Sequence, residues 1–302
     1  MNELLSQLTP VLIIFVLGIF LRKVRILTKN DGELLLKIVF HLTLPALIIL
    51  SVSIVQISLD LIFLPIIAGS TIVLTHLFFS LTGRFFAVER RIKGTAAVGA
   101  MIMNVGFLYP FLIAAYGHTG FARAVIFDFG NGLLVVTYVY YIASRYGDPE
   151  NQPIKIFRKL CASPPLWALA LAFTFNIADL PVPLPIRQTL ESLGDMTIPL
   201  IMLSLGVYFT PRLVQYPLLI SVLIIRIAGG LGCGLLFAEL FDLQGLTRSV
   251  AVICAAAPVG YNTLTFSSMA KLDVEFAACL VSISIALGIL YVPLLIFILQ
   301  PS

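Results

Sequence analysis

Residues 103–110 read MNVGFLYP and residues 257–263 read APVGYNT, and each stretch interrupts an apolar segment with glycine, proline and polar side chains. The two stretches occupy the same place in two halves of the chain, because Val105-Gly106 precedes Val259-Gly260 by 154 positions (259 − 105 = 154). Glycine and proline inside an apolar helix kink or unwind it. A repeated pair of interrupted membrane helices is typical of secondary transporters, whose binding sites lie near the bilayer midplane.

The composition shows which solvent surrounds most of the chain. Of the 302 residues, 60% are hydrophobic and 11% are charged, whereas soluble proteins carry about 25% charged residues. Apolar segments of roughly 20 residues, the length that crosses the hydrocarbon core as a helix, follow one another from Leu4 to Leu299. We therefore expect an all-α integral membrane protein with almost no soluble part.

The apolar segments between clusters of charged and turn-forming residues predict ten transmembrane helices. They lie near residues 4–22, 31–53, 60–82, 93–116, 119–144, 156–178, 186–209, 213–238, 246–269 and 274–299. Five spans precede a predicted cytoplasmic linker at residues 148–155, and five follow it. An odd number of spans in each half makes the second half enter the membrane in the opposite sense, so residues 1–147 and 156–302 are predicted to be inverted five-helix repeats.

Lysine and arginine are concentrated in the loops that follow the first, third and fifth predicted spans, at residues 22–29, 84–93 and 145–159. Positively charged loops stay in the cytoplasm. The sequence therefore predicts a multi-pass protein of the cell (inner) membrane with both termini outside. The net charge of +4 follows from these loops and does not indicate binding to nucleic acid.

Prolines strengthen the repeat and mark predicted breaks. Pro45 and Pro199 share the 154-residue offset and lie in matching contexts, Thr-Leu-Pro and Thr-Ile-Pro. Pro110 lies in the fourth span without a proline mate. We expect structural breaks near all three, because a proline removes one backbone hydrogen bond and clashes with the preceding turn.

The interrupted fourth and ninth spans are the predicted binding site. Each break exposes the N-terminal end of a half-helix, which carries about +0.5 elementary charge and free N–H groups. Two such ends favour a small organic anion, so the substrate-binding candidates are the residues around the two breaks: Asn104, Gly106, Tyr109, Pro258, Gly260, Tyr261 and Asn262. The alternative is that glycine and proline are simply common in membrane helices.

Four ionisable residues lie inside or close to the predicted spans, where charge is costly. Arg226, in the eighth span, either clamps the carboxylate of a substrate or pairs with Asp128 or Asp195. Asp128, Asp195 and His41 are candidates for proton relay or ion coupling, although His41 could equally be hydrogen-bonded to a neighbour without a transport role. His41 and Asp195 share the repeat offset (195 − 41 = 154).

Three motifs carry a family resemblance: Thr-Leu-Pro-Ala at 43–46, Asn-Val-Gly-Phe at 104–107 and Pro-Val-Gly-Tyr-Asn at 258–262. Together with the ten-span inverted repeat, they resemble the auxin efflux carrier family over essentially the whole chain. The resemblance implies that helices 4 and 9 cross at their breaks, with Asn104 and Pro258 at the crossing. It also implies a carboxylate-bearing substrate at that crossing, an elevator-like movement of one bundle against the other, and a homodimer.

The chain departs from the family pattern in two ways. Asparagine stands at position 104, so the crossing is not a symmetrical pair of prolines, and the nearest proline of that span is Pro110. The long cytoplasmic loop of the larger plant auxin exporters is missing, which argues against auxin as the substrate.

Three other readings remain open at this stage. A sodium-coupled symporter of the bile-acid type has a similar architecture and would bind a coupling cation. An intramembrane lipid-modifying enzyme is a remote alternative, because no His-Glu-x-x-His, Gly-x-Ser-x-Gly or phosphate-binding glycine loop is present. A receptor is disfavoured by the absence of an attached signalling domain. The four cysteines, Cys161, Cys233, Cys254 and Cys279, stand singly and indicate neither a metal site nor a cofactor.

Overall fold

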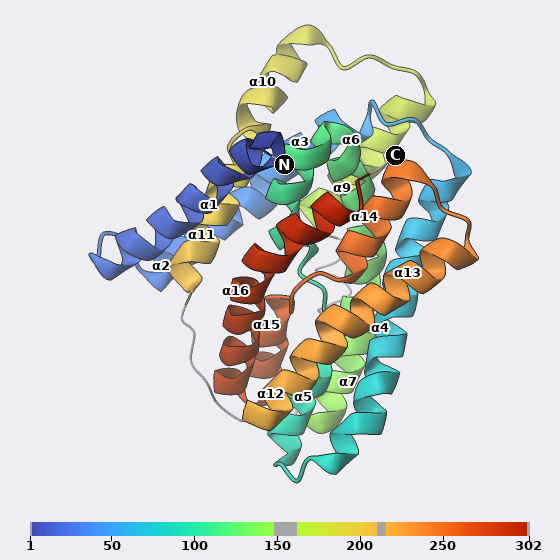
Figure 1. Cartoon of the computed structure of the whole chain (residues 1–302). Coiled ribbons are helices and arrows are strands. Elements are labelled where there is room, and N and C mark those ends of the chain that lie inside the picture. The colour runs from blue at the N-terminus through green and yellow to red at the C-terminus, as the bar shows by residue number, and fades with distance from the viewer. Residues whose placement is uncertain (1, 148–161, 210–215, 301–302) are drawn as a thin grey trace. The chain divides into compact units, whose positions relative to one another are not determined.

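The computed structural model of the chain describes residues 2–147, 162–209 and 216–300 (Figure 1). The predicted linker at 148–155 and Cys161 lie outside these described residues. Within them the backbone is helical, and a single isolated antiparallel bridge joins Met103 to Val259. The expectation of an all-helical chain is therefore confirmed for the described residues.

Six helical segments among the described residues are long and apolar enough to cross a membrane. They are Lys29–Val52, Leu59–Phe85, Val105–Tyr146, Leu184–Tyr208, Pro217–Leu240 and Val274–Ile298. Two shorter apolar helices cover Pro164–Ile177 and Gly245–Ala255. Large apolar side chains such as Phe85 and Leu290 are more than 70% exposed, as expected where lipid is the solvent. The chain is a multi-pass membrane protein.

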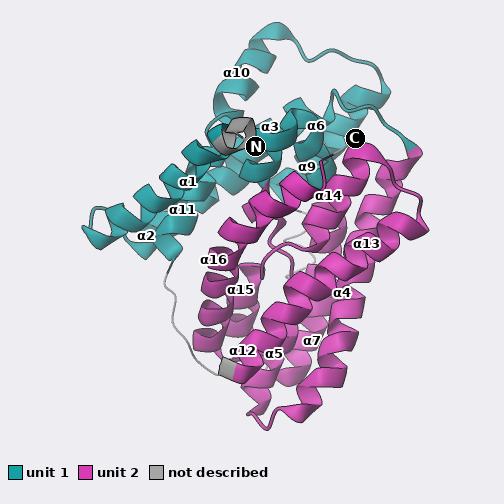
Figure 2. Ribbon diagram, viewed as in Figure 1, with its two compact units in different colours: residues 1–58, 109–125, 159–209 teal, residues 59–108, 126–158, 210–302 magenta. Residues whose placement is uncertain are grey.

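The chain divides into two compact units, each of which combines segments from both halves of the sequence (Figure 2). Unit 1 contains residues 1–58, 109–125 and 159–209, and unit 2 contains residues 59–108, 126–158 and 210–302. Whether residues 1–147 and 156–302 are separate repeats stays a prediction.

Unit 1 is built from two groups of helices that come from opposite ends of the sequence. Its helices are α1 (Asn2–Lys23), α2 (Lys29–Ile38), the π-helical turn η1 (Val39–Thr43), α3 (Leu44–Val52), α9 (Pro164–Ile177), α10 (Leu184–Gly194) and α11 (Thr197–Tyr208), together with part of α6 (Val105–Leu134). Thr28 caps α2 by accepting a hydrogen bond from the Asp31 backbone N–H, and the Asp31 carboxylate accepts one from the Thr28 backbone N–H. This reciprocal cap fixes where α2 begins.

Small residues bring α1 and α11 together within unit 1. A Cβ atom placed on Gly18 would lie 2.3 Å from the Leu203 carbonyl oxygen, and one on Gly206 would lie 2.1 Å from the Phe15 carbonyl oxygen. Such close approach of backbones is how helices associate in lipid, where apolar burial alone gives little driving force. Polar side chains then join neighbouring helices, as where Ser204 donates to the Gly32 carbonyl at 2.9 Å.

Unit 2 holds the remaining described helices and both interrupted segments. They are η2 (Leu59–Ile62), α4 (Phe63–Thr82), η3 (Gly83–Phe85), α5 (Arg90–Met101), both ends of α6, the π-helical turn η4 (Val135–Val139), α7 (Tyr140–Tyr146), α12 (Tyr216–Ile224), the π-helical turn η5 (Ile225–Gly229), α13 (Gly230–Leu240), α14 (Gly245–Ala255), α15 (Asn262–Met269) and α16 (Val274–Ile298). Asn131 returns to donate a hydrogen bond to the Met103 carbonyl at 3.2 Å. The chain must therefore reverse within α6.

The reversal of α6 occurs at Gly117. Its backbone has φ +62° and ψ −159°, a conformation that L side chains rarely adopt and glycine reaches without strain. Met103 and Asn131 lie at equal distances in sequence on either side of it. The single apolar segment Val105–Tyr146 therefore contains two antiparallel arms, in agreement with the two spans predicted on either side of residue 117.

The helix is irregular beside two of the three prolines, Pro45 and Pro199, and regular at the third, Pro110. Pro110 lies inside the helical part of α6, and the interruption of this span is at residues 102–104 instead. Pro45 follows the π-helical turn η1 at the start of α3, and Pro199 lies in the first turn of α11 after a break at Asp195 and Met196. Pro45 and Pro199 each lie within a continuous helical segment, Lys29–Val52 and Leu184–Tyr208. A proline there removes a backbone hydrogen bond to the preceding turn, which is where each irregularity lies.

We expect Gly206→Ala to lower the stability of the protein by about 1–3 kcal/mol, because the added methyl group overpacks the contact between α1 and α11. Thermal unfolding of the purified protein in detergent would measure the change. Gly132→Ala is the matched control, since nothing lies within 4 Å of a Cβ at that helical glycine. Equal melting temperatures for the two variants would show that α1 and α11 do not depend on the close approach at Gly206.

Candidate functional site

The two interrupted spans pair with one another inside unit 2. Helix α5 ends at Met101 and α6 begins at Val105, while α14 ends at Ala255 and α15 begins at Asn262. Between these helices, the Asn104 backbone N–H donates to the Pro258 carbonyl at 2.9 Å, and the Gly260 N–H donates to the Ile102 carbonyl at 2.9 Å. The two segments run antiparallel across the Met103–Val259 bridge. Four half-helix ends therefore meet at one place.

Helix α16 supports the second break with three residues on one face. The Ser284 hydroxyl accepts a hydrogen bond from the Val259 N–H at 3.0 Å, and the Tyr291 hydroxyl donates to the Ala256 carbonyl at 2.7 Å. Between them, a Cβ on Gly288 would lie 2.7 Å from the Pro258 ring. Positions 284, 288 and 291 follow the i, i+4, i+7 spacing of a helix face. This face satisfies backbone groups that lipid leaves unpaired.

Asn131 connects the first break to an acidic side chain. Its Nδ2 atom donates both to the Met103 carbonyl at 3.2 Å and to Asp128 Oδ1 at 2.7 Å. Asp128 is half-buried and Asn131 is buried. The predicted coupling candidate Asp128 is therefore linked to the crossing backbone through a single asparagine.

Apart from Arg226 Nε, three buried polar atoms in this region have no hydrogen-bond partner among the described residues. They are Asn104 Nδ2, Asn131 Oδ1 and Thr263 Oγ1. The other end of the Asn104 amide, Oδ1, caps α6 by accepting from the Phe107 N–H at 3.2 Å. Because buried polar atoms in folded proteins nearly always have partners, protein or water, each of these three is available to a ligand or a bound water.

The helix ends give the region a defined charge pattern. The N-terminal ends of α6 and α15 each carry about +0.5 elementary charge, and the C-terminal ends of α5 and α14 each carry about −0.5. The Arg226 side chain binds the negative ends: Nη1 donates to the Ala100 and Met101 carbonyls, both at 3.1 Å, and Nη2 donates to the Ala255 carbonyl at 2.6 Å. The acidic side chain linked to the crossing is Asp128, through Asn131.

The observed contacts of Arg226 are not the pair with Asp128 or Asp195 that the sequence suggested, while its role as a substrate clamp stays a prediction. The side chain is fully buried, and its two terminal nitrogens are engaged by backbone carbonyls. Among the described residues, the ion pairs with N···O of 4.0 Å or less are Lys37–Glu33 and Arg187–Glu191, so no carboxylate of this part of the chain pairs with Arg226. Arg226 instead caps the C-terminal ends of two helices, α5 and α14.

The remaining candidates of the crossing are placed as follows. Gly260 is buried, and a Cβ there would lie 2.2 Å from the Ile102 side chain, so only glycine allows the two breaks to meet. Gly106 is half-buried in the first turn of α6, Tyr261 is half-buried just before α15, and Asn262 is exposed at its first position. Tyr109 belongs to unit 1, where its ring meets the Phe121 ring edge to face at 4.9 Å.

His41 and Asp195 both lie in unit 1, and both are exposed. His41 lies in η1 and hydrogen-bonds through Nδ1 to the Lys37 carbonyl at 2.9 Å. Asp195 is the residue after α10, and its backbone N–H bonds back to the Glu191 carbonyl. Neither is part of the paired breaks in unit 2, and their roles in coupling stay predictions.

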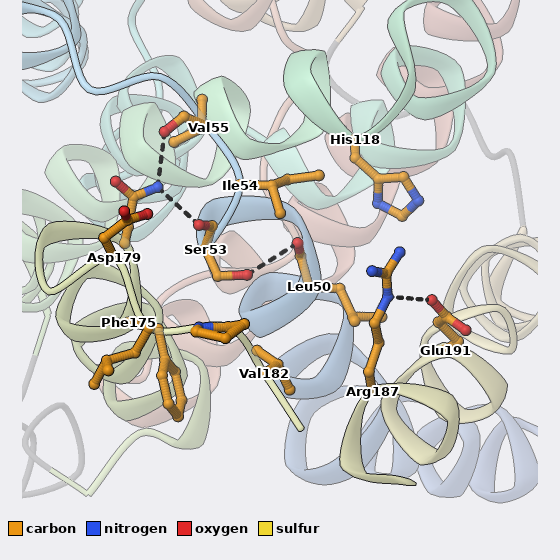
Figure 3. A pocket seen from close by; sticks show the side chains of 13 residues that line it. Leu50, Ser53, Ile54, Val55, His118, Phe175, Asp179, Val182, Arg187 and Glu191 are labelled. Atoms are coloured by element: carbon orange, nitrogen blue, oxygen red, sulfur yellow. Dashed lines mark hydrogen bonds and ion pairs between the residues drawn. The ribbon is translucent and has the colours of Figure 1, made fainter. Parts of the chain in front are cut away.

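Unit 1 also contains a cavity of about 680 Å³. Figure 3 shows His118, Arg187 and Glu191 on one side of it and Asp179 on the other. Arg187 is already paired with Glu191 at 2.8 Å, and His118 is bonded to Ser51. None of the residues predicted to bind substrate lines this cavity. Its lining includes two acidic side chains, Asp179 and Glu191, and one arginine, Arg187. A cavity with this charge balance does not favour an anion, so the paired breaks remain the better candidate.

Sequence reasoning missed two residues of the region, Ser284 and Tyr291, and gave no role of their own to two others, Asn131 and Thr263. The three on α6 and α16 had a usable signal, because polar side chains at helical spacing within an apolar span face protein rather than lipid. Thr263 is the last residue of the second quoted stretch, 257–263. The backbone groups that Asn131, Ser284 and Tyr291 meet depend on the crossing itself and have no signature in the sequence.

An all-helical chain whose apolar spans are interrupted in pairs is a polytopic membrane transporter, and comparison with known proteins agrees with this class. The family model described as "Membrane transport protein" matches residues 4–296. The chain belongs to this family, that of the auxin efflux carriers.

Two archaeal relatives cover nearly the whole chain. An "Uncharacterized transporter" of Methanothermobacter thermautotrophicus is 28% identical over 291 residues, which is 94% of each chain. An uncharacterized transporter of Methanocaldococcus jannaschii is 26% identical over 295 residues, which is 94% of this chain and 95% of the relative. The similarity therefore extends over both interrupted spans.

We expect Tyr291→Phe to destabilise the protein by about 1–3 kcal/mol, because the Ala256 carbonyl loses its donor in a water-poor region. Thermal unfolding in detergent is the measurement. Tyr141→Phe serves as the control, since the Tyr141 ring is 57% exposed. An unchanged melting temperature for Tyr291→Phe would mean that the hydroxyl contributes nothing to holding the second break.

Proposed function

We propose that this membrane transporter carries a small organic anion whose carboxylate binds at the N-terminal ends of α6 and α15. The single observation that carries the proposal is the buried, unpartnered Asn104 Nδ2 at the start of α6. A carboxylate accepts hydrogen bonds from amide and backbone N–H donors and is stabilised by the positive end of a helix. Thr263 Oγ1 offers a further donor near the start of α15.

The charges of unit 2 support an anion over a cation. The two C-terminal helix ends at the crossing are already bound by Arg226. The two N-terminal ends together retain about one positive elementary charge. When Asp128 holds its proton, the potential that these ends offer to a ligand is therefore positive.

The ten-span inverted repeat is part of the proposal, and the ends of the elements support it. Helices α5 and α14 end at Met101 and Ala255, and α1 and α9 end at Lys23 and Ile177; each pair differs by 154 (255 − 101 = 154). The antiparallel bridge between Met103 and Val259 fits two repeats that cross the membrane in opposite senses. We place both termini outside an inner membrane, because the basic loops of the sequence then face the cytoplasm.

We assign alternating access to movement of unit 2, which contains the crossing, relative to unit 1. Each unit draws on both halves of the sequence, as expected if two repeats contribute equivalent helices to each bundle. An organic anion that leaves a cell with a negative interior gains about 2.3 kcal/mol per charge per 100 mV. Export can therefore run as a uniport, whereas import needs a coupled proton or cation.

A bile-acid type sodium symporter is the second candidate, and Asp128 is the observation that favours a coupled ion. Its carboxylate lies one hydrogen bond from the crossing through Asn131. Against sodium, the carbonyls at the helix ends are occupied by Arg226. We take Asp128 as a proton site, because a hydrogen-bonded carboxylate inside a membrane is most easily carried across when it is neutral. We assign no enzymatic activity, cofactor or metal to this region.

Thermal stabilisation by a panel of mono- and dicarboxylates tests the proposed substrate class. A ligand that binds only the folded protein raises its melting temperature, by an amount that grows with the ratio of its concentration to its Kd. We expect one or more acids to stabilise the protein and Asn104→Ala to weaken that stabilisation at least about tenfold in ligand concentration, as for a lost charge-assisted hydrogen bond of about 1.4 kcal/mol or more. Asn30→Ala, a change at an exposed asparagine of α2, is the control.

Two results would contradict the proposal. Stabilisation by neutral or cationic compounds alone would show that the helix ends do not select an anion. Stabilisation that Asn104→Ala leaves intact would place the carboxylate elsewhere, with the cavity of unit 1 as the next region to test. The acid found in this assay then serves as the substrate in transport measurements with liposomes.

We expect Asp128→Asn to remove the pH dependence of transport while leaving binding of the anion in place. Asparagine has the same shape and keeps a hydrogen-bonding oxygen, but it cannot release a proton at any working pH. Uptake into liposomes with an imposed pH gradient, compared with uptake driven by a membrane potential alone, measures the effect. Asp60→Asn, in the short η2 helix, is the control. If uptake by Asp128→Asn still follows the pH gradient, the proton is carried elsewhere.

A further inference from the structure

The negative helix ends at the crossing are bound by a cation that the chain supplies itself. In transporters with discontinuous helices, the carbonyls of unwound backbone and of half-helix C-terminal ends coordinate the coupling sodium ion. Here the Ala100, Met101 and Ala255 carbonyls receive hydrogen bonds of 2.6–3.1 Å from Arg226. The guanidinium therefore occupies the position in which such an ion would be expected.

The positive and negative charges at this position nearly cancel. The ends of α5 and α14 carry together about one negative elementary charge, which matches the single positive charge of arginine. The planar guanidinium presents several N–H donors in a fixed fork, so one side chain reaches two helices. Its Nε atom is the one nitrogen of the group without a partner among the described residues.

The residues around Arg226 leave space for its side chain. Arg226 lies in the π-helical turn η5, and such single turns widen a helix and redirect its side chains, often at functional positions. A Cβ on Gly230 would lie 2.4 Å from Arg226 Nη2 and 2.2 Å from the Ala255 carbonyl oxygen. A Cβ on Gly234 would lie 2.9 Å from the Ala255 side chain. These two glycines, four positions apart, let α13 approach the end of α14.

We propose that Arg226 is a positioning residue that acts as a tethered replacement for a coupling cation, so that the crossing binds its anion without sodium. The fixed charge neutralises the C-terminal ends permanently, which leaves the N-terminal ends to the substrate. This inference deepens the proposed function, because it assigns the class of coupling. The occupancy of the carbonyl site can be tested without any substrate.

The first experiment measures the thermal stability of the full-length protein in detergent, for the wild type, Arg226→Ala and the control Arg187→Ala. Each is tested with about 100 mM sodium chloride, with choline chloride, and with about 10 mM guanidinium chloride in choline, since stabilisation depends on ligand concentration relative to Kd. We expect the wild type and the control to melt at the same temperature in sodium and in choline. Arg226→Ala should melt about 5 °C lower or more, and sodium or guanidinium should recover part of that loss.

Recovery by a free cation is the result that a purely packing role cannot produce. If neither cation raises the melting temperature of Arg226→Ala above its value in choline, the carbonyls do not form a cation site and the proposal fails. A wild type that sodium stabilises over choline would also overturn it, because a second cation would then bind alongside Arg226.

A second pair of variants covers the case in which Arg226→Ala does not fold. Arg226→Lys keeps the charge and Arg226→Met removes it, while both keep a long unbranched side chain and lose the fork. We expect Arg226→Lys to melt well above Arg226→Met. Equal melting temperatures would show that the charge is not what the helix ends require.

The last arm separates this inference from the proposed function. The rise in melting temperature that a carboxylate produces in the wild type should be the same in sodium chloride and in choline chloride. A shift that requires sodium would overturn the inference while supporting an anion carrier. If no carboxylate raises the melting temperature but the results with sodium and guanidinium are as expected, the anion proposal fails. The proposal that Arg226 replaces a coupling cation is then still supported.

Discussion

Backbone groups that a broken helix releases inside a membrane must find partners within the protein, and the rest of unit 2 follows from this constraint. The N–H groups of Asn104 and Gly260 are satisfied by the opposite break. The Val259 N–H and the Ala256 carbonyl are satisfied by α16, and the Met103 carbonyl is satisfied by Asn131. One break alone could not meet these needs, because each supplies donors and acceptors to the other. This mutual dependence explains why the chain is interrupted twice and at matching positions.

The same breaks separate charge along the crossing. Two C-terminal helix ends are negative and two N-terminal ends are positive, and Arg226 binds only the negative pair. Burying an isolated guanidinium would be costly, and three carbonyl bonds together with the dipoles of two helices offset that cost without a carboxylate. An acidic partner would have balanced the arginine equally well, but it would also have cancelled the positive potential of the site. With backbone carbonyls as the counter-charge of Arg226, no acidic partner of the arginine opposes the anion binding that we propose.

The sequence predicted the helical class, the apolar segments and the two interrupted spans, because each rests on local signals: hydropathy, glycine and proline. It also predicted a break at Pro110, although the chain is helical there and the interruption lies at 102–104, where no proline occurs. It found Arg226 but gave it carboxylate partners, because a charge in lipid suggests an opposite charge. Every residue has a backbone carbonyl, so contacts with carbonyls at a helix end cannot be read from a sequence. The contacts of Asn131 with Met103 and of Tyr291 with Ala256 could not be predicted for the same reason.

The two glycines at matching positions of the breaks, Gly106 and Gly260, have different surroundings, and this is one way in which the two proposed repeats differ. Gly106 and Gly260 are repeat mates, yet a Cβ on Gly260 would meet Ile102 at 2.2 Å, whereas one on Gly106 would come no closer than 3.9 Å to Asn104. Only one of the two mates is required by packing. The first break has asparagine at 104 where the second has Pro258, so the first gains an amide donor and the second gains a rigid turn. In the proposed repeats, the first break therefore supplies polar contacts, and the second supplies the geometry that holds the two breaks together.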